Sequence, residues 1–335
     1  MNAVVGLTPG DAEGVGMEMI LRMLSDEAMT ERFTPLIYGS SKVAVHYRKA
    51  LEIPNLALNV VTDASQVAKG KINLLNVGNE DIKSEGEGGE RETGKWAAVA
   101  LQRALEDVKA GKIVGVVSGP IASTPYKEEE TAEGELLRKQ RKSTTLMVKG
   151  RMRVASLTQG VEKQDVAAEI THERIVKKVR EMVRTLREDF GVDRARVVVM
   201  ILNEKNENGE YGKEEADVIV PAIKQLCDEG VLCFGPIESK RYFDEGEHRN
   251  YDAGLALYEA QGFDEMKSLV GDDAVRFVEL DDIVWTTSTG DAEPEKAGKN
   301  AVEIDGFRNA VYGVLDVNAQ RGRRAQEAKV IPLGQ

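Results

Sequence analysis

Short runs of valine, isoleucine and leucine alternate along the chain with longer stretches in which apolar residues recur at every third or fourth position. Several runs are apolar without interruption, which is typical of strands buried on both faces of a largely parallel sheet. Strands are expected at residues 4–8, 35–38, 57–61, 72–77, 113–118, 145–148, 154–157, 197–202 and 231–234. The alternation of strands and helices predicts an α/β fold with helices on both faces of the sheet.

The stretches between the strands have the period of amphipathic helices. In one of them, Thr171 is placed to cap a helix whose apolar face continues to Phe190, and Gly191 follows where a C-terminal glycine is common. Two polar segments interrupt the pattern: 84–95 is expected to be a surface loop, and 126–143 a solvated helix or a crossing between domains. Helices are expected at residues 96–108, 172–190, about 213–228 and about 307–325.

Composition and charge exclude several classes of protein. A chain of 335 residues corresponds to about two domains, and 41% hydrophobic with 30% charged residues is ordinary globular composition. With 45 basic and 57 acidic residues the net charge is −12, which argues against nonspecific binding to nucleic acid or to an anionic membrane. No apolar run approaches the roughly 18 residues of a membrane span, and the N-terminus lacks the features of a signal peptide, so a cytoplasmic location is expected.

The residue types that most often carry catalysis are sparse. Cys227 and Cys233 are expected to be small apolar thiols at a helix end and in the next buried strand, with a redox or metal pair as the alternative. The three histidines, His46, His172 and His248, lack the spacing of metal ligands. The chain also has no G-x-S-x-G motif, so these patterns assign no catalytic residue.

Three segments place polar or glycine-rich sequence beside predicted strands. Gly10, Gly14 and Gly16 surround the turn after the first strand, and either a tight structural turn or a ligand-binding loop explains them. Residues 89–96, GERETGKW, approach the phosphate-binding loop pattern but end in Trp where that loop has Ser or Thr. The polar run 201–212 follows a strand, at the end where α/β sheets bind ligands, although a solvated loop has the same composition.

Four segments carry a resemblance that covers most of the chain in order. They are LTPGDAEGVG at 7–16, VVSGPIAS at 116–123, ILNEKNENGEYGKEE at 201–215 and ALYEAQG at 256–262. They resemble motifs of the 4-hydroxythreonine-4-phosphate dehydrogenases, the PdxA family of vitamin B6 biosynthesis. The resemblance implies two α/β/α domains of the isocitrate/isopropylmalate-dehydrogenase-like type with an interdomain cleft, and a homodimer. One domain is expected at 1–125 plus 300–335, and the other at 126–299.

The same alignment changes the residues on which the family's chemistry depends. Family members bind a divalent metal through three histidines, and the metal positions the substrate for hydride transfer to NAD. The aligned positions here are Gly160, Lys205 and Glu259. Glycine has no ligand atom and lysine brings a positive charge, so a divalent metal is not expected. Lys267 lies at the place of a substrate-contacting lysine, although a surface lysine on a helix or loop is the alternative.

Further family motifs are altered. Trp285 aligns with a family Arg, Gly290 with a family His, and Arg276 roughly with a family Asn. Residues 131–137, TAEGELL, replace a Gly-His-Thr-Glu substrate motif. The sequence therefore favours a catalytically divergent or inactive family member that binds a small phosphorylated ligand or acts as a regulatory pseudoenzyme. The alternative is an active NAD-dependent oxidoreductase on 4-hydroxythreonine-4-phosphate or a related phosphorylated hydroxy acid, for which the resemblance implies NAD as cofactor.

Overall fold

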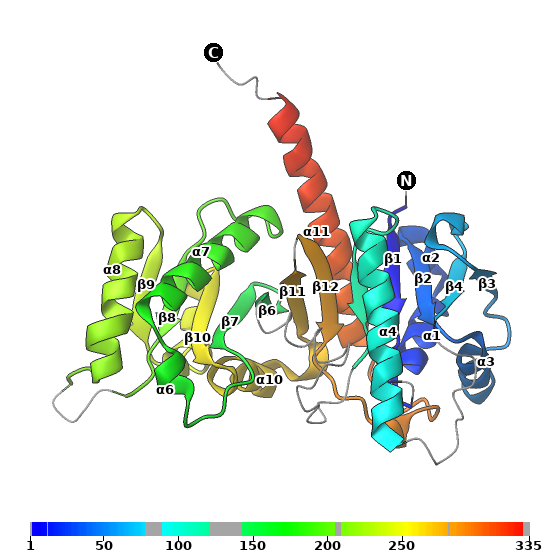
Figure 1. The fold of residues 1–335 in the computed structure, drawn as a ribbon, viewed down its shortest axis with the longest axis horizontal. Helices are drawn as coiled ribbons and strands as arrows, with labels where there is room; N and C mark the ends of the chain where they lie inside the picture. Colours follow the sequence, from blue (N-terminus) through cyan, green and yellow to red (C-terminus); the bar gives the residue numbers. More distant parts are fainter. Residues whose placement is uncertain are drawn as a thin grey trace. The chain divides into compact units, whose positions relative to one another are not determined.

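The computed structural model describes residues 2–11, 13–77, 89–120, 143–204, 209–280 and 282–330. The chain divides into two compact units. The first consists of Met1–Gln140 and Glu279–Leu315, and the second of Arg141–Val278 and Asp316–Gln335. Each unit combines a sheet with helices, so the predicted α/β class is confirmed (Figure 1). Among the described residues, no helix is both long enough and apolar enough to cross a membrane.

The first unit is built on a parallel sheet with the strand order β3-β4-β2-β1-β5-β12. Its central strands are buried along almost their whole length, because they are continuous apolar runs with helices packed against them. The strands are β1 (Val4–Thr8), β2 (Thr34–Gly39), β3 (Leu58–Val61), β4 (Ile72–Asn76), β5 (Val116–Ser118) and β12 (Ile283–Ser288).

The helices of the first unit include one that begins earlier than predicted. Residues 89–95 were expected to belong to a surface loop, but they form the first turns of α4 (Gly89–Lys109). The run contains Glu, Arg and Lys, which are good helix formers, and Gly94, the glycine inside the helix, costs only about 1 kcal/mol. The segment that resembles a phosphate-binding loop is therefore helical. The other elements are α1 (Gly16–Leu24), α2 (Glu27–Arg32), α3 (Ser41–Ala50), the short turns η1 (Ala64–Gln66) and η6 (Pro294–Lys296), and the beginning of α11 (Asp305–Val330).

The second unit has a mixed sheet with the strand order β11-β6-β7-β10-β8-β9. Strand β10 runs parallel to both β7 and β8, β8 runs parallel to β9, and β6 is antiparallel to β7. The strands are β6 (Thr144–Lys149), β7 (Met152–Thr158), β8 (Val197–Met200), β9 (Cys233–Ile237), β10 (Ala253–Tyr258) and β11 (Val275–Leu280). Neither β10, β11 nor β12 was among the predicted strands.

Helix α7 of the second unit forms as predicted. Thr171 is its N-cap, and the Thr171 hydroxyl accepts a hydrogen bond from the backbone N–H of Arg174 at 3.3 Å. Gly191 follows the helix with φ of +70°, a conformation that glycine adopts without strain. The other helical elements are α6 (Val166–Glu169), α7 (His172–Glu188), η2 (Glu215–Ile219), α8 (Val220–Asp228), α9 (Ser239–Phe243), η3 (Glu247–Asn250), η4 (Ala260–Asp264), α10 (Glu265–Val270) and η5 (Gly271–Asp273). The predicted polar segment 126–143 lies outside the described residues except for Ser143.

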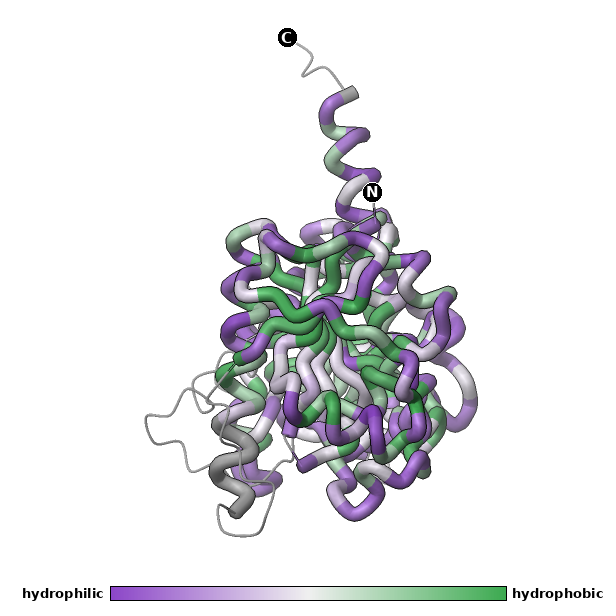
Figure 2. The backbone as a smooth tube through the Cα atoms, turned by 90° about the vertical axis from the view of Figure 1, so that its right-hand side faces the viewer, coloured by the Kyte–Doolittle hydropathy of each residue, from purple (hydrophilic) through white to green (hydrophobic). Residues whose placement is uncertain are grey.

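The strands consist mainly of apolar residues, whereas the helices and loops combine apolar and polar residues (Figure 2). In the second unit, Val154, Val198 and Met200 from the sheet pack against Phe263 and Met266 from η4 and α10. This packing fixes η4 and α10 against the sheet, directly after the end of β10.

The two units differ in extent from the expected domains. Residues 279–299 were assigned to the second domain, but β12 pairs with β5 and so belongs to the first unit. The end of α11 was assigned to the first domain, but Arg321 pairs with Asp189 at 2.6 Å, within the second unit.

Candidate functional site

In the second unit, β7, β10 and β8 are parallel, so their C-terminal ends lie on one side of the sheet, where α/β folds bind ligands. Gly160 lies two residues beyond β7, and Glu259 directly follows β10. The backbone N–H of Gly160, a residue with φ of +62°, donates a hydrogen bond to Glu259 Oε2 at 2.8 Å. The structure thus brings together two of the three positions that align with metal-binding histidines. The third, Lys205, follows β8 and lies outside the described residues.

These residues do not fit a three-ligand metal centre. Gly160 offers a backbone donor rather than a ligand atom, and that donor already occupies one oxygen of Glu259. Within the described ranges, no three side chains of His, Cys, Asp or Glu gather closely enough to hold a metal ion. The arrangement can instead accept hydrogen bonds or a cationic group at the remaining carboxylate oxygen of Glu259.

The end of β8 is held by two buried polar side chains from π-helical turns. In η4, the Gln261 amide donates to Ile201 O at 2.6 Å and accepts from the backbone N–H of Leu257 at 2.7 Å. In η2, Glu215 is fully buried, and its Oε1 accepts from the backbone N–H groups of Leu202 and Asn203, each at 2.7 Å. Such π-helical turns are rare and are frequent at functional sites. They fix the backbone that leads into the segment containing Lys205.

Sequence reasoning did not assign functions to Glu215 or Gln261. Each acts on backbone that is distant in sequence, so no local pattern identifies its role. Both residues nevertheless lie within segments that carry the family resemblance, and that position was the available signal.

Lys267, the predicted substrate-binding residue, is placed on α10, one helical turn after Phe263. Its amino group lies 3.4 Å from Asp272 Oδ1, and its side chain is 37% exposed. An exposed pair of this kind contributes little to stability.

In the first unit, the glycine-rich segment is explained by close packing of backbone. Gly10 has φ of +75°, and a Cβ added to it would lie 2.1 Å from Pro120 O. A Cβ added to Gly16 would lie 1.7 Å from Pro9 O. The glycines therefore allow α1 to begin directly against the turns that follow β1 and β5, whether or not a ligand binds there.

Trp285, which the resemblance aligns with a family arginine, is a buried indole. The side chain belongs to β12, is 4% exposed, and donates from Nε1 to Ser118 Oγ on β5 at 2.8 Å. This hydrogen bond satisfies the buried indole N–H, so Trp285 is an integrated part of the first unit's core. Gly290, aligned with a family histidine, follows β12 and offers no ligand side chain.

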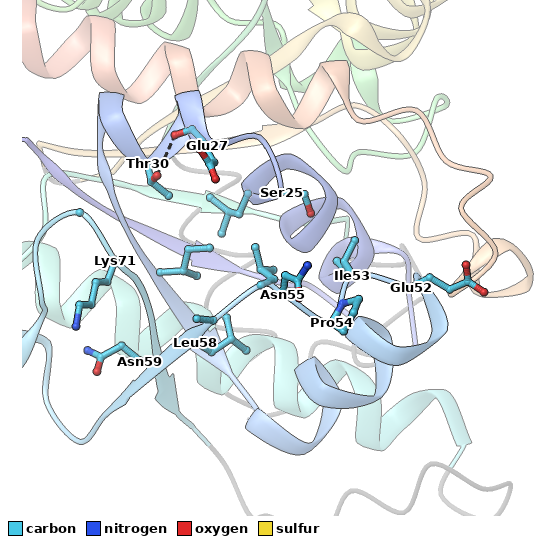
Figure 3. A pocket seen from close by; sticks show the side chains of 15 residues that line it. Ser25, Glu27, Thr30, Glu52, Ile53, Pro54, Asn55, Leu58, Asn59 and Lys71 are labelled. Carbon is cyan, nitrogen blue, oxygen red and sulfur yellow. Dashed lines mark hydrogen bonds between the residues drawn. The ribbon is translucent and has the colours of Figure 1, made fainter.

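The first unit also has a pocket of about 680 Å³, which lies at the N-terminal ends of β3 and β4 (Figure 3). Lys71 and Asn59 lie on one side of it, and Glu27 and Thr30 on another. None of the predicted site residues lines this pocket. Part of its wall is formed by segments that lead into β3 and β4, whereas ligands of α/β sheets bind where strands end.

The three histidines lie on separate elements, His46 on α3, His172 on α7 and His248 on η3. The two cysteines, both free, match the expected helix end and buried strand. Cys227 is exposed and donates from Sγ to the backbone carbonyl of Cys233 at 3.1 Å. Burial raises the pKa of Cys233 to about 12, so almost none of that thiol ionises near neutral pH.

The two thiols are therefore expected to react very differently. At pH 8, a chromogenic disulfide reagent should modify Cys227 in the native protein and reach Cys233 only after unfolding, because the thiolate is the reacting form. The measurement is the number of protein thiols that react with time, with and without denaturant. Cys227→Ser is the control and should leave no fast-reacting thiol. Equal fast rates for both cysteines in the native protein would contradict the expectation.

Comparison with known proteins places both the fold and the sequence. The model of the family "Pyridoxal phosphate biosynthetic protein PdxA" matches residues 31–314. A 4-hydroxythreonine-4-phosphate dehydrogenase from Bacteroides thetaiotaomicron is 34% identical over 343 residues, covering 98% of this chain and 92% of the relative. The protein of the same name from Sulfurihydrogenibium is 28% identical, covering 92% of this chain and 96% of the relative.

Solved structures agree on the architecture. The crystal structure of a 4-hydroxythreonine-4-phosphate dehydrogenase from Burkholderia phymatum has a TM-score of 0.74 at 23% identity, covering 95% of this chain and 98% of the other. Isocitrate dehydrogenase from Methylococcus capsulatus has a TM-score of 0.52 at 12% identity, covering 98% and 89%. The fold is thus that of the isocitrate-dehydrogenase-like α/β proteins, as expected. Within this class, the chain belongs to the PdxA family, which confirms the resemblance.

Proposed function

We propose that this PdxA-family chain binds a small phosphorylated ligand as a regulatory pseudoenzyme and does not carry out metal-dependent hydride transfer. The observation that supports the proposal is the hydrogen bond from the Gly160 N–H to Glu259. A backbone donor there meets a carboxylate, whereas family members have two metal-binding histidines. A homodimer, expected from the resemblance, is part of the proposal.

The physical argument concerns the ligands that a divalent cation requires. Three neutral imidazoles offer three lone pairs and no charge that repels the metal. Gly160 offers no lone pair, and one Glu259 oxygen already accepts a hydrogen bond. Lys205 adds a positive charge to the third position, and at about 4 Å two like unit charges repel by roughly 1 kcal/mol in water and more where water is excluded. The Lys205 ammonium would more readily attract the phosphate of a ligand.

The second candidate function is an active NAD-dependent dehydrogenase on 4-hydroxythreonine-4-phosphate or a related phosphorylated hydroxy acid. It is favoured by the 34% identity to the Bacteroides thetaiotaomicron protein of that name, which extends over 98% of the chain. The two candidates differ in whether reduction of NAD can be measured.

A steady-state assay separates them. The protein is stripped of metal, reloaded with Mg²⁺, Zn²⁺ or Co²⁺, and mixed with NAD and 4-hydroxythreonine-4-phosphate. We expect NADH formation no faster than the blank, because the chain cannot assemble the three ligands that polarise the substrate hydroxyl. The Bacteroides thetaiotaomicron relative, treated identically, is the positive control. Metal-stimulated turnover that a chelator abolishes would establish the dehydrogenase instead.

A further inference from the structure

Residues 289–304 join β12 to α11 within the first unit, and we call this segment the β12–α11 connection. Apart from the short turn η6, its backbone is irregular. Ala292 and Val302 are buried, whereas the residues between them are half-buried or exposed. The connection is therefore anchored to the first unit near both of its ends, and its middle lies at the surface.

Helix α1 and its N-cap hold the connection at three points. The residues that make these contacts are spaced by three and four positions, which places them on one face of the helix. The hydrogen bonds run from Val15 N to Ala292 O at 2.9 Å, from Gly298 N to Glu18 Oε2 at 2.7 Å, and from Arg22 Nη1 to Val302 O. The connection thus lies along α1 as one segment with regularly placed contacts.

The central contact comes from a fully buried carboxylate, Glu18. Its other oxygen, Oε1, lies 3.3 Å from Nη1 of Arg22, one helical turn further on. A buried charge is tolerated when it is paired and hydrogen-bonded, and losing one partner is costly. One of the two partners of Glu18 is the backbone of the connection at Gly298. The charge of Glu18 therefore favours the position in which the connection lies against α1.

The backbone of the connection is not fully relaxed in this position. Glu293 and Asn300 have φ of +39° and +56°, in the left-handed region that favours glycine. Asparagine tolerates that region better than glutamate does. Such conformations persist only where the surrounding structure maintains them, and they are common in segments that move. If the contacts with α1 break, Glu293 can return to an ordinary conformation.

The connection also packs against the glycine-rich turn after β1, for which the sequence left ligand binding open. A Cβ added to Gly14 would lie 3.2 Å from Ala292 O and 3.4 Å from Ala292 Cβ. Val15, the next residue, donates its N–H to the same carbonyl. On this side, the turn therefore becomes accessible only when Ala292 moves away.

We propose that the β12–α11 connection is a gate over the turn after β1, and that Glu18 holds the gate closed. Opening breaks the three contacts with α1, frees the N–H of Val15 and leaves the sheet of the first unit intact. Segments held by few buried contacts open locally in this way, at a lower free energy than the whole domain. The inference goes beyond the proposed function and holds equally for a pseudoenzyme and a dehydrogenase.

Native-state hydrogen exchange of the ligand-free protein tests the gate. The amides of 289–304 and of Val15 should share one opening reaction, which is faster than exchange in β4. Low concentrations of urea should hardly change it, because local opening exposes little surface. If Val15 does not exchange together with the connection, opening does not uncover the turn, and the gate is overturned.

Three variants test the role of Glu18. Glu18→Ala leaves the Gly298 N–H without its charged acceptor, so exchange in the connection should become about tenfold faster or more. Glu18→Gln keeps an acceptor oxygen and should give a smaller increase. Arg22→Gln removes the donor to Val302 and should also accelerate the connection. If Glu18→Ala does not fold, the other two variants make the same comparison. Unchanged rates in the variants that fold overturn the role of Glu18.

The matched control is Ile72→Val, which makes a small cavity in β4 of the same unit, where Ile72 is 7% exposed. It should accelerate exchange in β4 a few-fold, by about twofold to tenfold, because global unfolding becomes easier. It should leave the connection unchanged, since a gate opens without global unfolding. Equal acceleration of β4 and the connection in Ile72→Val would show that the connection opens only when the unit unfolds, and would overturn the proposal.

Discussion

Replacing Gly16 with alanine is expected to lower the free energy of unfolding by more than about 4 kcal/mol, enough to prevent the first unit from folding. A Cβ at this position would lie 1.7 Å from Pro9 O and 2.7 Å from its carbonyl carbon. Both atoms belong to backbone, which cannot rotate away as a side chain does. Either α1 or the turn after β1 must move, and both pack against the buried centre of the sheet.

The control for this substitution is Gly322→Ala in α11. Gly322 lies within a helix, and an added Cβ would meet no atom within 4 Å. Alanine there should raise the free energy of unfolding by about 0.5–1 kcal/mol, because it restricts the unfolded chain and favours the helix. Urea denaturation followed by circular dichroism measures both variants. Similar stabilities for the two would show that the turn after β1 relaxes easily.

Replacing Glu215 with alanine is expected to lower the free energy of unfolding by about 3 kcal/mol. Its carboxylate accepts bonds from the backbone N–H groups of Leu202 and Asn203, and from the Asn203 side chain at 3.3 Å. Alanine leaves these donors without their charged acceptor in a place where Glu215 itself is fully buried. The segment after β8 should also become more accessible, so faster amide exchange at Leu202 and Asn203 is a second measurement.

Two control variants show whether the loss of stability comes from the buried hydrogen-bond acceptor or from the loss of a carboxylate charge. Glu215→Gln retains an oxygen for the two backbone donors and should cost only about 1 kcal/mol. Glu214→Ala removes a neighbouring carboxylate whose bond to the Asn203 side chain, at 3.0 Å, is exposed, so its effect should stay below about 0.5 kcal/mol. If Glu215→Ala were as mild as Glu214→Ala, the buried hydrogen bonds would contribute little.

Several strands rich in β-branched residues could be predicted from the sequence, but β12, whose sequence IVWTTS is also rich in them, was missed. The run at Val4–Thr8 forms β1 with those bounds, and the strand expected at 197–202 forms β8. Strand β10 was missed because its sequence, AGLALY, contains no β-branched residue and does not differ locally from a buried helix. Its Gly254 is explained only by tertiary packing, since a Cβ there would lie 2.8 Å from the Tyr242 ring.

The candidate site could be predicted only in part, and through the resemblance rather than through local pattern. The resemblance identified Gly160 and Glu259 as neighbours, and the structure joins them by a hydrogen bond. The roles of Glu215 and Gln261 could not be predicted, because each side chain binds backbone that is distant in sequence. The compact units differ from the expected domains at β12, because that strand pairs with β5 of the first unit.

The π-helical turn η4 limits how this part of the chain can change in length. A helix advances by about 100° per residue, and the π-helical turn η4 already holds one residue more than an α-helical turn, so gain of a further residue in η4 would rotate all of α10 by that angle. Met266, which is fully buried, would then turn out of the core. Single-residue insertions between Glu259 and Met266 should therefore be rejected by selection even where substitutions are accepted.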